Sequence, residues 1–525
     1  QSNRKEMIKQ LSEFVEKVSY YADQIAEFTK QHAAEIHRVT DLLTYNPNEP
    51  LIFSTGLFLM LFLGFAFVYM CLQRRLTARL LFVTAFSYYF YYKSSGFYFV
   101  LLALVTISDF FLANLIHRYR ERRGLGKLFV TLSLLIDLGL LGYFKYTNFF
   151  VGMVTRMLEY NFQPWDIFLP VGISFFTFQS LSYTIDVYRG HLKPLPSLLD
   201  YAFYVSFFPQ LVAGPIVRAS DFAPQIRQPL TITRDMFARG LFFILIGLFK
   251  KAVISDYISL NFVDRIFDNP GLYSGLENLL GIYGYAMQIY CDFSGYSDMA
   301  IGIALLLGFH FPLNFNAPYA ATNISDFWRR WHISLSTWIR DYIYISLGGN
   351  RKGKIRQYFN LILTMLLGGL WHGASLNFII WGGMHGVALA VHKLFSQGLL
   401  KHSRYYVSRG IRRPLAIFVT FHFVCFTWLF FRNLSFETSK MMLNRIFTDF
   451  RADLFVPVLH GYKYVLALML FGFVTHYIPN RWQEGIIAGL RRCNVVVCAL
   501  FLVIVIYIVI QVKSSAIQPF IYFQF

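Results

Sequence analysis

The sequence predicts an all-α, polytopic transmembrane protein. Of its 525 residues, 56% are hydrophobic and 19% aromatic, while only 15% are charged. A soluble protein of this size carries about 25% charged residues. Many apolar runs approach or exceed the ~20 residues that a helix needs to cross a bilayer. The sequence lacks the strand-like alternation of outer-membrane barrels, so we expect a bundle of membrane helices.

The net charge of +19 comes largely from basic residues in short loops between the apolar runs. Such loops follow the positive-inside pattern of membrane proteins. No polar domain carries a basic surface interleaved with stacking aromatics, so we expect no nucleic-acid partner. The five cysteines lie in or beside apolar runs without metal-ligand spacing. We therefore expect them to be small buried hydrophobic residues.

Residues 1–48 form a polar segment that we expect to be an extracytoplasmic amphipathic helix. One apolar stripe recurs every three or four residues, as in a helix with one buried face. The stripe comprises Leu11, Phe14, Val18, Tyr21, Ile25 and Phe28. This pattern favours a short coiled coil or a helix on the membrane surface. Pro47 and Pro50 end the helix. Residues 49–525 would then form the membrane domain.

Loop charges give an orientation for this membrane domain. The first span, about 51–72, ends in a basic cluster, and the densest basic loop so far follows at 117–123. Two shorter apolar runs, 80–92 and 98–116, lie between these clusters. Two spans place both clusters in the cytoplasm, which leaves residues 1–48 outside it.

Many further apolar runs follow, and several are short or interrupted. They lie at 128–150, 168–187, 198–216, 237–256, 276–291, 297–311, 357–370, 374–393, 414–431, 463–478 and 494–512. Glycine and proline break the chain at Leu169–Gly172 and at Ala213–Pro215. Broken helices at membrane depth are tolerated where they line a cavity. We therefore expect short or re-entrant helices around a central funnel or tunnel. The basic loops at 351–356 and 404–413 should be cytoplasmic.

The stretch 323–345 places ionisable residues in a mostly apolar region, and its spacing predicts one helix with two stripes. The apolar stripe comprises Ile324, Trp328, Trp331, Leu335, Trp338 and Tyr342, and the polar stripe comprises Arg329, His332, Ser336 and Arg340. Such a helix would lie at the interface or enter the membrane part-way. Arg329 and Arg330 offer anion sites suited to phosphate. Spacing alone leaves open an interfacial helix whose arginines meet lipid headgroups and whose histidine is structural.

His372 lies at the end of a compact apolar run, among Gly368, Gly369 and Gly373. From the basic loop at 351–356, ~16 helical residues rise ~24 Å, which puts His372 deep in the membrane. A neutral imidazole at that depth could act as general base for a hydroxyl. Spacing alone leaves open a buried histidine that only bonds a neighbouring helix.

Other polar residues are weaker candidates. Asp292 and Asp298 are six residues apart and do not share a helix face, so a paired-carboxylate hydrolase site is not expected. One of them could orient a histidine or pair with an arginine. His310 and His385 each lie beside a glycine at the end of a run. Nothing in the sequence has the spacing of a zinc site or a phosphate-cradling loop.

Six ordered motifs together resemble the membrane-bound O-acyltransferase family, in its bacterial polysaccharide-acylating branch. They are Leu169–Gln179, Phe207–Pro215, Asp292–Asp298, Asn314–Pro318, Phe327–His332 and Leu370–Ser375. The resemblance covers roughly residues 51–525; typical members lack a segment like 1–48. It implies a tunnel through a ring of helices, with His372 and His332 as the two active-site histidines. The candidate donor- or substrate-binding residues are Arg329, Arg330, Ser336, Asp292, Asp298, Trp371 and Asn377.

The resemblance implies an O-acyltransferase of the bacterial inner membrane. An acyl group, with acetyl favoured, would pass from a cytoplasmic thioester donor such as acetyl-CoA or an acyl carrier protein. The acceptor would be a hydroxyl of an extracytoplasmic polysaccharide or of a periplasmic relay protein. We expect no bound cofactor and no metal. D-alanyl transfer from a carrier protein is the alternative within this class, and a transporter or flippase is the alternative outside it.

Overall fold

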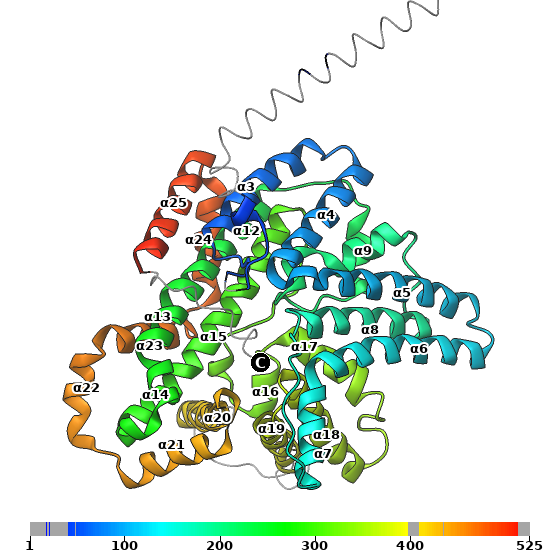
Figure 1. The fold of residues 1–525 in the computed structure, drawn as a ribbon. Helices are drawn as coiled ribbons and strands as arrows, with labels where there is room; N and C mark the ends of the chain where they lie inside the picture. Colours follow the sequence, from blue (N-terminus) through cyan, green and yellow to red (C-terminus); the bar gives the residue numbers. More distant parts are fainter. Residues whose placement is uncertain are drawn as a thin grey trace, which may run out of the picture.

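The computed structural model describes Lys17, Tyr20 and residues 40–47, 49–396, 409–433 and 435–512. Throughout these residues the regular structure is helical, as the sequence predicts. Figure 1 shows α15 near the middle of the molecule, with α5, α6 and α8 on one side and α20 to α23 on the other. The predicted helix within 1–48 lies almost entirely outside the described residues.

The first helices confirm the predicted order of apolar runs. They are α3 (Gly56–Cys71), α4 (Leu76–Ser95), α5 (Phe99–Arg118), α6 (Arg123–Leu141) and α7 (Thr147–Met157). A short 3-10 turn that begins at Gly96, with φ +62°, separates α4 from α5. The π-helical turn η2 (Gly142–Tyr146) joins α6 to α7.

The helix α15 (Gly275–Leu306) is the longest in the described chain. The sequence predicts two runs here, 276–291 and 297–311, and that division is wrong: one helix of 32 residues contains the first run and continues into the second as far as Leu306. Ser274 and Glu277 form a capping box at its start. Small residues let it approach α12 (Arg234–Leu248) closely, since a Cβ on Gly302 would lie 2.6 Å from the Gly240 carbonyl oxygen.

The predicted interruptions at glycine and proline are present. The run 168–187 starts with an irregular loop and becomes α8 (Ile173–Arg189) only after Gly172. Gly172 has φ +76°, and a Cβ there would lie 2.6 Å from the Leu211 carbonyl oxygen, so only glycine fits. The next run is divided into α9 (Leu198–Ser206) and α10 (Phe208–Leu211) before an irregular stretch leads to α11 (Ala219–Ile226).

The prediction of one helix over 323–345 is wrong. The stretch contains α16 (Ile324–Trp328), α17 (Ile333–Ile339) and the π-helical turn η7 (Arg340–Tyr344). The break lies at His332, whose φ of +43° is left-handed and incompatible with a continuing helix. The polar stripe from Arg329 to Arg340 is therefore not the face of a single helix.

The helices α18 (Lys354–His372) and α19 (Leu376–Leu394) pack against each other through glycines. A Cβ on Gly369 would lie 2.2 Å from the Phe378 carbonyl oxygen, and one on Gly382 would lie 2.3 Å from that of Met365. This backbone contact fixes the end of α18, where His372 lies. The remaining α-helices are α13 (Asp256–Ile258), α14 (Asp264–Asp268), α20 (Arg409–Arg432), α21 (Phe436–Thr448), α22 (Phe455–Gly461), α23 (Lys463–Thr475), α24 (Asn480–Arg492) and α25 (Val495–Val512).

Three helical segments of the described chain are long and apolar enough to cross a membrane: Leu76–Arg118, Arg123–Met157 and Ile411–Arg432. A fourth span exists if Ala452–Gly461 and Lys463–Thr475, which meet at 91°, count as one. The first predicted span is the shorter helix α3, of 16 residues. Most of the other predicted runs are likewise short or broken, as expected for helices that surround a cavity.

Candidate active site

The structure brings the two predicted histidines to the same part of the core. His372 is the last residue of α18, and His332 precedes α17. Both are buried, with exposures of 3% and 0%. Trp371 contacts both rings: its centroid lies 6.3 Å from that of His332 and 5.0 Å from that of His372. Aromatic side chains therefore cover much of both imidazoles.

Asn314 holds His332 in one orientation. The Asn314 amide donates from Nδ2 to Ser297 Oγ at 3.1 Å, which turns its Oδ1 toward His332. The Ser334 backbone N–H also donates to this Oδ1, at 3.2 Å. His332 Nδ1 lies 3.1 Å from the same oxygen, so Nδ1 must carry the proton. His332 Nε2 is then a lone-pair acceptor, and it has no hydrogen-bond partner among the described residues.

A cavity of about 370 Å³ leads along α18 to His372. Its wall on α18 runs from Leu361 to His372, ~16 Å of helix. The other lining residues are Ser325, Trp328, Arg329, Ile333, Leu335, Ser336, Thr337, Ile339, Arg340, Tyr344, Thr364, Met365, Gly368, Trp381, Leu389 and Lys393. Because Gly382 and Gly386 of α19 pack on Met365 and Ile362, Lys393 lies toward the end far from His372.

Basic residues line this donor cavity, as we name it below. Arg329 and Lys393 have no carboxylate partner among the described residues, and Lys393 Nζ lies 5.9 Å above the Tyr344 ring. Arg340 is paired with Asp341 at 2.6 Å. Burial raises the pKa of the Asp341 carboxyl, but hydrogen bonds from Arg340 and Arg218 outweigh burial and hold it below its ordinary value. Of the basic residues that line the donor cavity, Arg329 and Lys393 are therefore the ones available to bind an anion.

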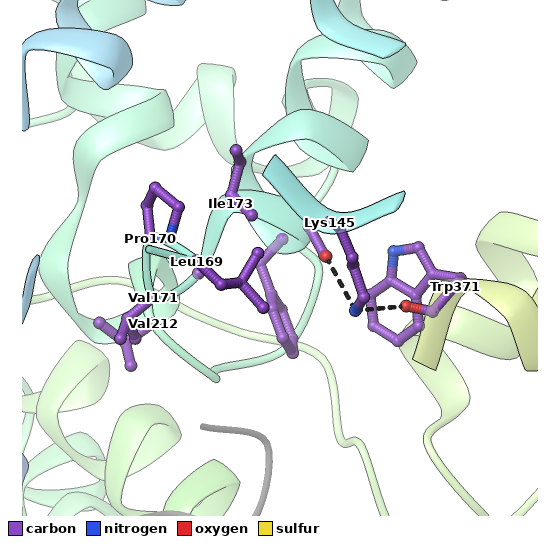
Figure 2. A pocket seen from close by; sticks show the side chains of 10 residues that line it. Lys145, Leu169, Pro170, Val171, Ile173, Val212 and Trp371 are labelled. Atoms are coloured by element: carbon purple, nitrogen blue, oxygen red, sulfur yellow. Dashed lines mark hydrogen bonds between the residues drawn. The ribbon is translucent and has the colours of Figure 1, made fainter. Parts of the chain in front are cut away.

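A second, smaller cavity of about 40 Å³ lies beside Trp371 (Figure 2). Its lining comprises Lys145, Leu169, Pro170, Val171, Gly172, Ile173, Ser174, Phe175, Val212 and Trp371. The predicted break at Leu169–Gly172 thus forms part of a cavity wall. Trp371 lines this cavity and His372 lines the donor cavity. The end of α18 therefore stands between the two spaces.

Several predicted site residues do not line the donor cavity. Arg330 pairs with Asp326 at 2.9 Å. Asn377 Nδ2 donates to the Asn433 carbonyl oxygen at 2.6 Å. The sequence suggests that one of Asp292 and Asp298 could orient a histidine or pair with an arginine. In the structure both form ion pairs with lysines of η3 (Phe249–Ser255), Asp292 at 2.6 Å to Lys251 and Asp298 at 2.7 Å to Lys250. These pairs neutralise buried charge between α15 and η3.

The two weaker histidine candidates, His385 and His310, make hydrogen bonds that stabilise the fold. His385 is buried, and both of its ring nitrogens are bonded. Trp328 Nε1 donates to its Nδ1 at 3.3 Å, and its Nε2 lies 3.0 Å from Thr427 Oγ1. His310 is exposed, and its backbone is held by the Gln225 side chain. Among the described residues, no three His, Cys, Asp or Glu side chains gather in a way that could hold a metal ion.

Sequence reasoning missed Lys145, Lys393 and the role of Asn314. A signal existed for Lys145, because a lysine inside the apolar run 128–150 is costly at membrane depth and marks a functional site by default. Asn314 was visible only as part of a motif, and its contact with His332 depends on the tertiary fold.

Comparison with known proteins identifies the family. The sequence model of "MBOAT, membrane-bound O-acyltransferase family" matches residues 86–436, more than half of the chain. The chain belongs to the membrane-bound O-acyltransferase family. The prediction of a multi-pass membrane O-acyltransferase is thereby confirmed. This stretch contains all six motifs whole, including the Leu370–Ser375 motif with His372.

Individual relatives within the family favour acetyl over D-alanyl transfer. The chain is 40% identical over 403 residues to a probable alginate O-acetylase of Pseudomonas aeruginosa, covering 76% of this chain and 75% of that protein. It is 39% identical over 424 residues to a peptidoglycan O-acetyltransferase of Helicobacter pylori, covering 75% and 79%. A teichoic acid D-alanyltransferase of Bacillus subtilis is 33% identical over 288 residues, covering 52% and 71%. The likeness to the bacterial polysaccharide-acylating branch, which the six motifs predict, is confirmed, and within that branch the chain is similar to alginate O-acetylases.

Proposed function

We propose that this O-acyltransferase moves an acetyl group from a cytoplasmic thioester donor to a hydroxyl of an extracytoplasmic polysaccharide or of a relay protein. The observation that carries the proposal is the donor cavity, which joins a buried histidine to two cations that have no carboxylate partner within the described ranges. The relatives that transfer acetyl groups, which match more of the chain than the D-alanyltransferase does, support acetyl as the acyl group. The bacterial inner membrane is the location that such a reaction requires.

The charges of the donor cavity suit an anionic thioester. Acetyl-CoA and the arm of an acyl carrier protein both carry phosphate, which guanidinium and ammonium groups bind well. Arg329 and Lys393 would hold the phosphate, and the apolar wall from Leu361 to Gly368 would hold the arm. Ser336 lines the same space. This arrangement would direct the thioester carbonyl toward His372.

The acceptor would approach from the side of the small cavity. A space of about 40 Å³ admits a group of roughly the size of one or two waters, such as a hydroxymethyl, but not a sugar ring. A slender hydroxyl-bearing side group of the acceptor would therefore enter first. The end of α18 would stand between this group and the donor.

The proposed chemistry needs one base. His372 takes the proton of the acceptor hydroxyl as its oxygen attacks the thioester carbonyl carbon. The tetrahedral intermediate then expels the thiolate, which takes the proton from His372, leaving an acetyl ester and a free thiol. His332 Nε2, as an acceptor, is suited to hold the hydroxyl or an N–H of His372. The neutral form set by Asn314 has no Nε2 proton for an oxyanion, so its role is better described as positioning.

Replacing His372 tests the proposal. The variant His372→Gln keeps a hydrogen-bonding side chain but cannot take the proton, so acetyl transfer by the purified protein should fall by about 10²–10⁴-fold. Donor affinity should stay within a few-fold. The exposed His460 of α22 provides the control, and His460→Gln should transfer normally. Near-normal turnover by a folded His372→Gln protein would overturn the catalytic assignment. Mass spectrometry of the cell envelope, with and without the gene, separates acetyl from D-alanyl.

A further inference from the structure

Two adjacent residues of the turn η2 hold the end of α18. Lys145 Nζ donates to the carbonyl oxygens of Trp371, at 2.7 Å, and His372, at 3.0 Å. Tyr146 Oη donates to the carbonyl oxygen of Leu370 at 2.9 Å. The last three carbonyls of the helix that carries His372 are therefore bonded by two neighbouring side chains from another part of the chain. Figure 2 shows the Lys145 ammonium bonded to the Trp371 carbonyl oxygen.

The end of α18 needs such donors. The last four carbonyls of a helix have no partner within it, and an unbonded carbonyl away from water is costly. The chain cannot supply these bonds by a glycine cap, because Gly373 is extended, with φ −166°. An ammonium group also matches the partial negative charge of a helix C-terminus.

In the part of the chain that the structure describes, Lys145 has no carboxylate partner that would explain its place. No ion pair of Lys145 occurs among the described residues, whereas the buried lysines of η3 have carboxylate partners, one for Lys250 and two for Lys251. Its Nζ instead lies 3.5 Å from Ser174 Oγ and 5.9 Å from the Trp371 ring centre. A lysine in an apolar run is costly, so a role beyond general stability is expected. The π-helical form of η2 also supports a functional role for Lys145, since such turns occur often at functional sites.

We propose that Lys145, together with Tyr146, is a positioning residue that fixes the His372 imidazole between the donor cavity and the small cavity. The two side chains bond the carbonyls of residues 370–372 and so set the position of the His372 backbone. The proposal rests on the proposed function of His372 as the base. A displacement of about 1 Å at a reacting group can lower a rate by ~10²-fold, so loss of these bonds should affect turnover strongly.

Three variants and one control test this role. Lys145→Met removes the ammonium but keeps an apolar stem, and Lys145→Arg keeps a cationic donor. Tyr146→Phe removes only the hydroxyl. The exposed Lys127, near the start of α6, provides the control variant Lys127→Met. The measurements are kcat, the donor KM and the melting temperature of each purified protein in detergent or lipid.

We expect Lys145→Met to lower kcat by about 10–100-fold with a donor KM within about three-fold of the parent. Lys145→Arg should restore at least part of this loss. Tyr146→Phe should lower kcat by about five-fold, the factor of one hydrogen bond. Lys127→Met should match the parent. A purely structural role predicts a different result: a lower melting temperature with normal kcat for the folded protein.

The outcomes separate this proposal from the proposed function. If His372→Gln is inactive while folded Lys145→Met and Tyr146→Phe turn over normally, the positioning role is wrong and the base assignment stands. If His372→Gln is active, the base assignment itself fails. Should Lys145→Met not fold, Tyr146→Phe decides, because it keeps the ring: an unchanged kcat overturns the positioning role, and a lowered kcat with intact KM and melting temperature supports it.

Discussion

Asn314 Oδ1 lies 3.1 Å from His332 Nδ1 and also accepts the Ser334 backbone N–H. One amide oxygen therefore sets both the ring protonation of His332 and the start of α17. His332 has a left-handed backbone, which is sparsely populated for residues other than glycine and persists where neighbouring contacts enforce it. The hydrogen bond from Ile333 N to the Asn314 carbonyl oxygen, at 2.9 Å, is such a contact.

Removal of the Asn314 side chain should therefore impair both stability and turnover. In Asn314→Ala, the buried Ser334 N–H and His332 Nδ1 lose their acceptor, at a cost of about 1–3 kcal/mol per unsatisfied group. We expect a lower melting temperature and a loss of kcat of more than ten-fold. Asn314→Asp retains an acceptor for Nδ1–H and should keep more activity than Asn314→Ala. The exposed Asn114 gives the control Asn114→Ala, which should behave like the parent. Equal kcat in the Asn314→Ala and Asn114→Ala proteins would contradict this role.

Arg329 and Arg330 should differ in their effect on the donor. Arg329 lines the donor cavity and pairs with no carboxylate of the described chain, whereas Arg330 pairs with Asp326 and does not line the cavity. A hydrogen bond to a charged group contributes about 1.5–3 kcal/mol, so Arg329→Gln should raise the donor KM by about ten-fold or more with little change in kcat. Lys393→Gln should act in the same direction.

Arg330→Gln is the matched control for this pair, because it removes the same charge one residue away. It should leave the donor KM within a few-fold. Steady-state kinetics with varied donor concentration measure the difference. If both arginine variants raise KM equally, the effect is one of overall charge and the donor cavity is not the binding site.

Close packing of α18 on α19 should depend on Gly369. A Cβ there would meet the Phe378 carbonyl oxygen at 2.2 Å, and a backbone atom cannot move away as a flexible side chain would. Overpacking typically costs 1–3 kcal/mol or more, so Gly369→Ala should lower the melting temperature and the yield of monodisperse protein. Gly139 of α6 has nothing within 4 Å of its Cβ position, and Gly139→Ala should be neutral or slightly stabilising. A stable Gly369→Ala protein would show that the two helices can separate without loss of fold.

The fold class and the broken helices follow from the sequence because they depend on composition and on local geometry. An apolar composition requires helices in a membrane, and the break at Leu169–Gly172 is a property of the residues themselves. The one helix predicted over 323–345 fails for the opposite reason. Contacts with Asn314 stabilise the left-handed backbone of His332. The spacing of apolar residues along the sequence gives no information about such a contact.

The active site, too, could be predicted from the sequence only in part, because some of its features depend on tertiary contacts. Spacing alone could not bring His332 and His372 together, since forty residues separate them; the family resemblance did so, and the structure places both against Trp371. Charge alone could not distinguish Arg329 from Arg330, because the distinction depends on which carboxylate each one meets. The sequence offers Asp292 and Asp298 as donor- or substrate-binding residues, but it does not show that their partners are Lys251 and Lys250, because these contacts depend on the tertiary fold.

Membrane orientation is the last prediction. Basic loops favour the cytoplasm, which puts the loop 351–356 inside and the residues before the first span outside. Cysteines at Thr44 and Lys352, both exposed, report the two sides; Gly353 is avoided because its φ of +84° disfavours any side chain. The exposed native Cys71 and Cys493 should first be replaced by serine. On intact spheroplasts, an impermeant maleimide should label Thr44→Cys, and it should label Lys352→Cys only after permeabilisation. Labelling in the reverse order would invert the topology, and the donor cavity would then lack access to a cytoplasmic thioester.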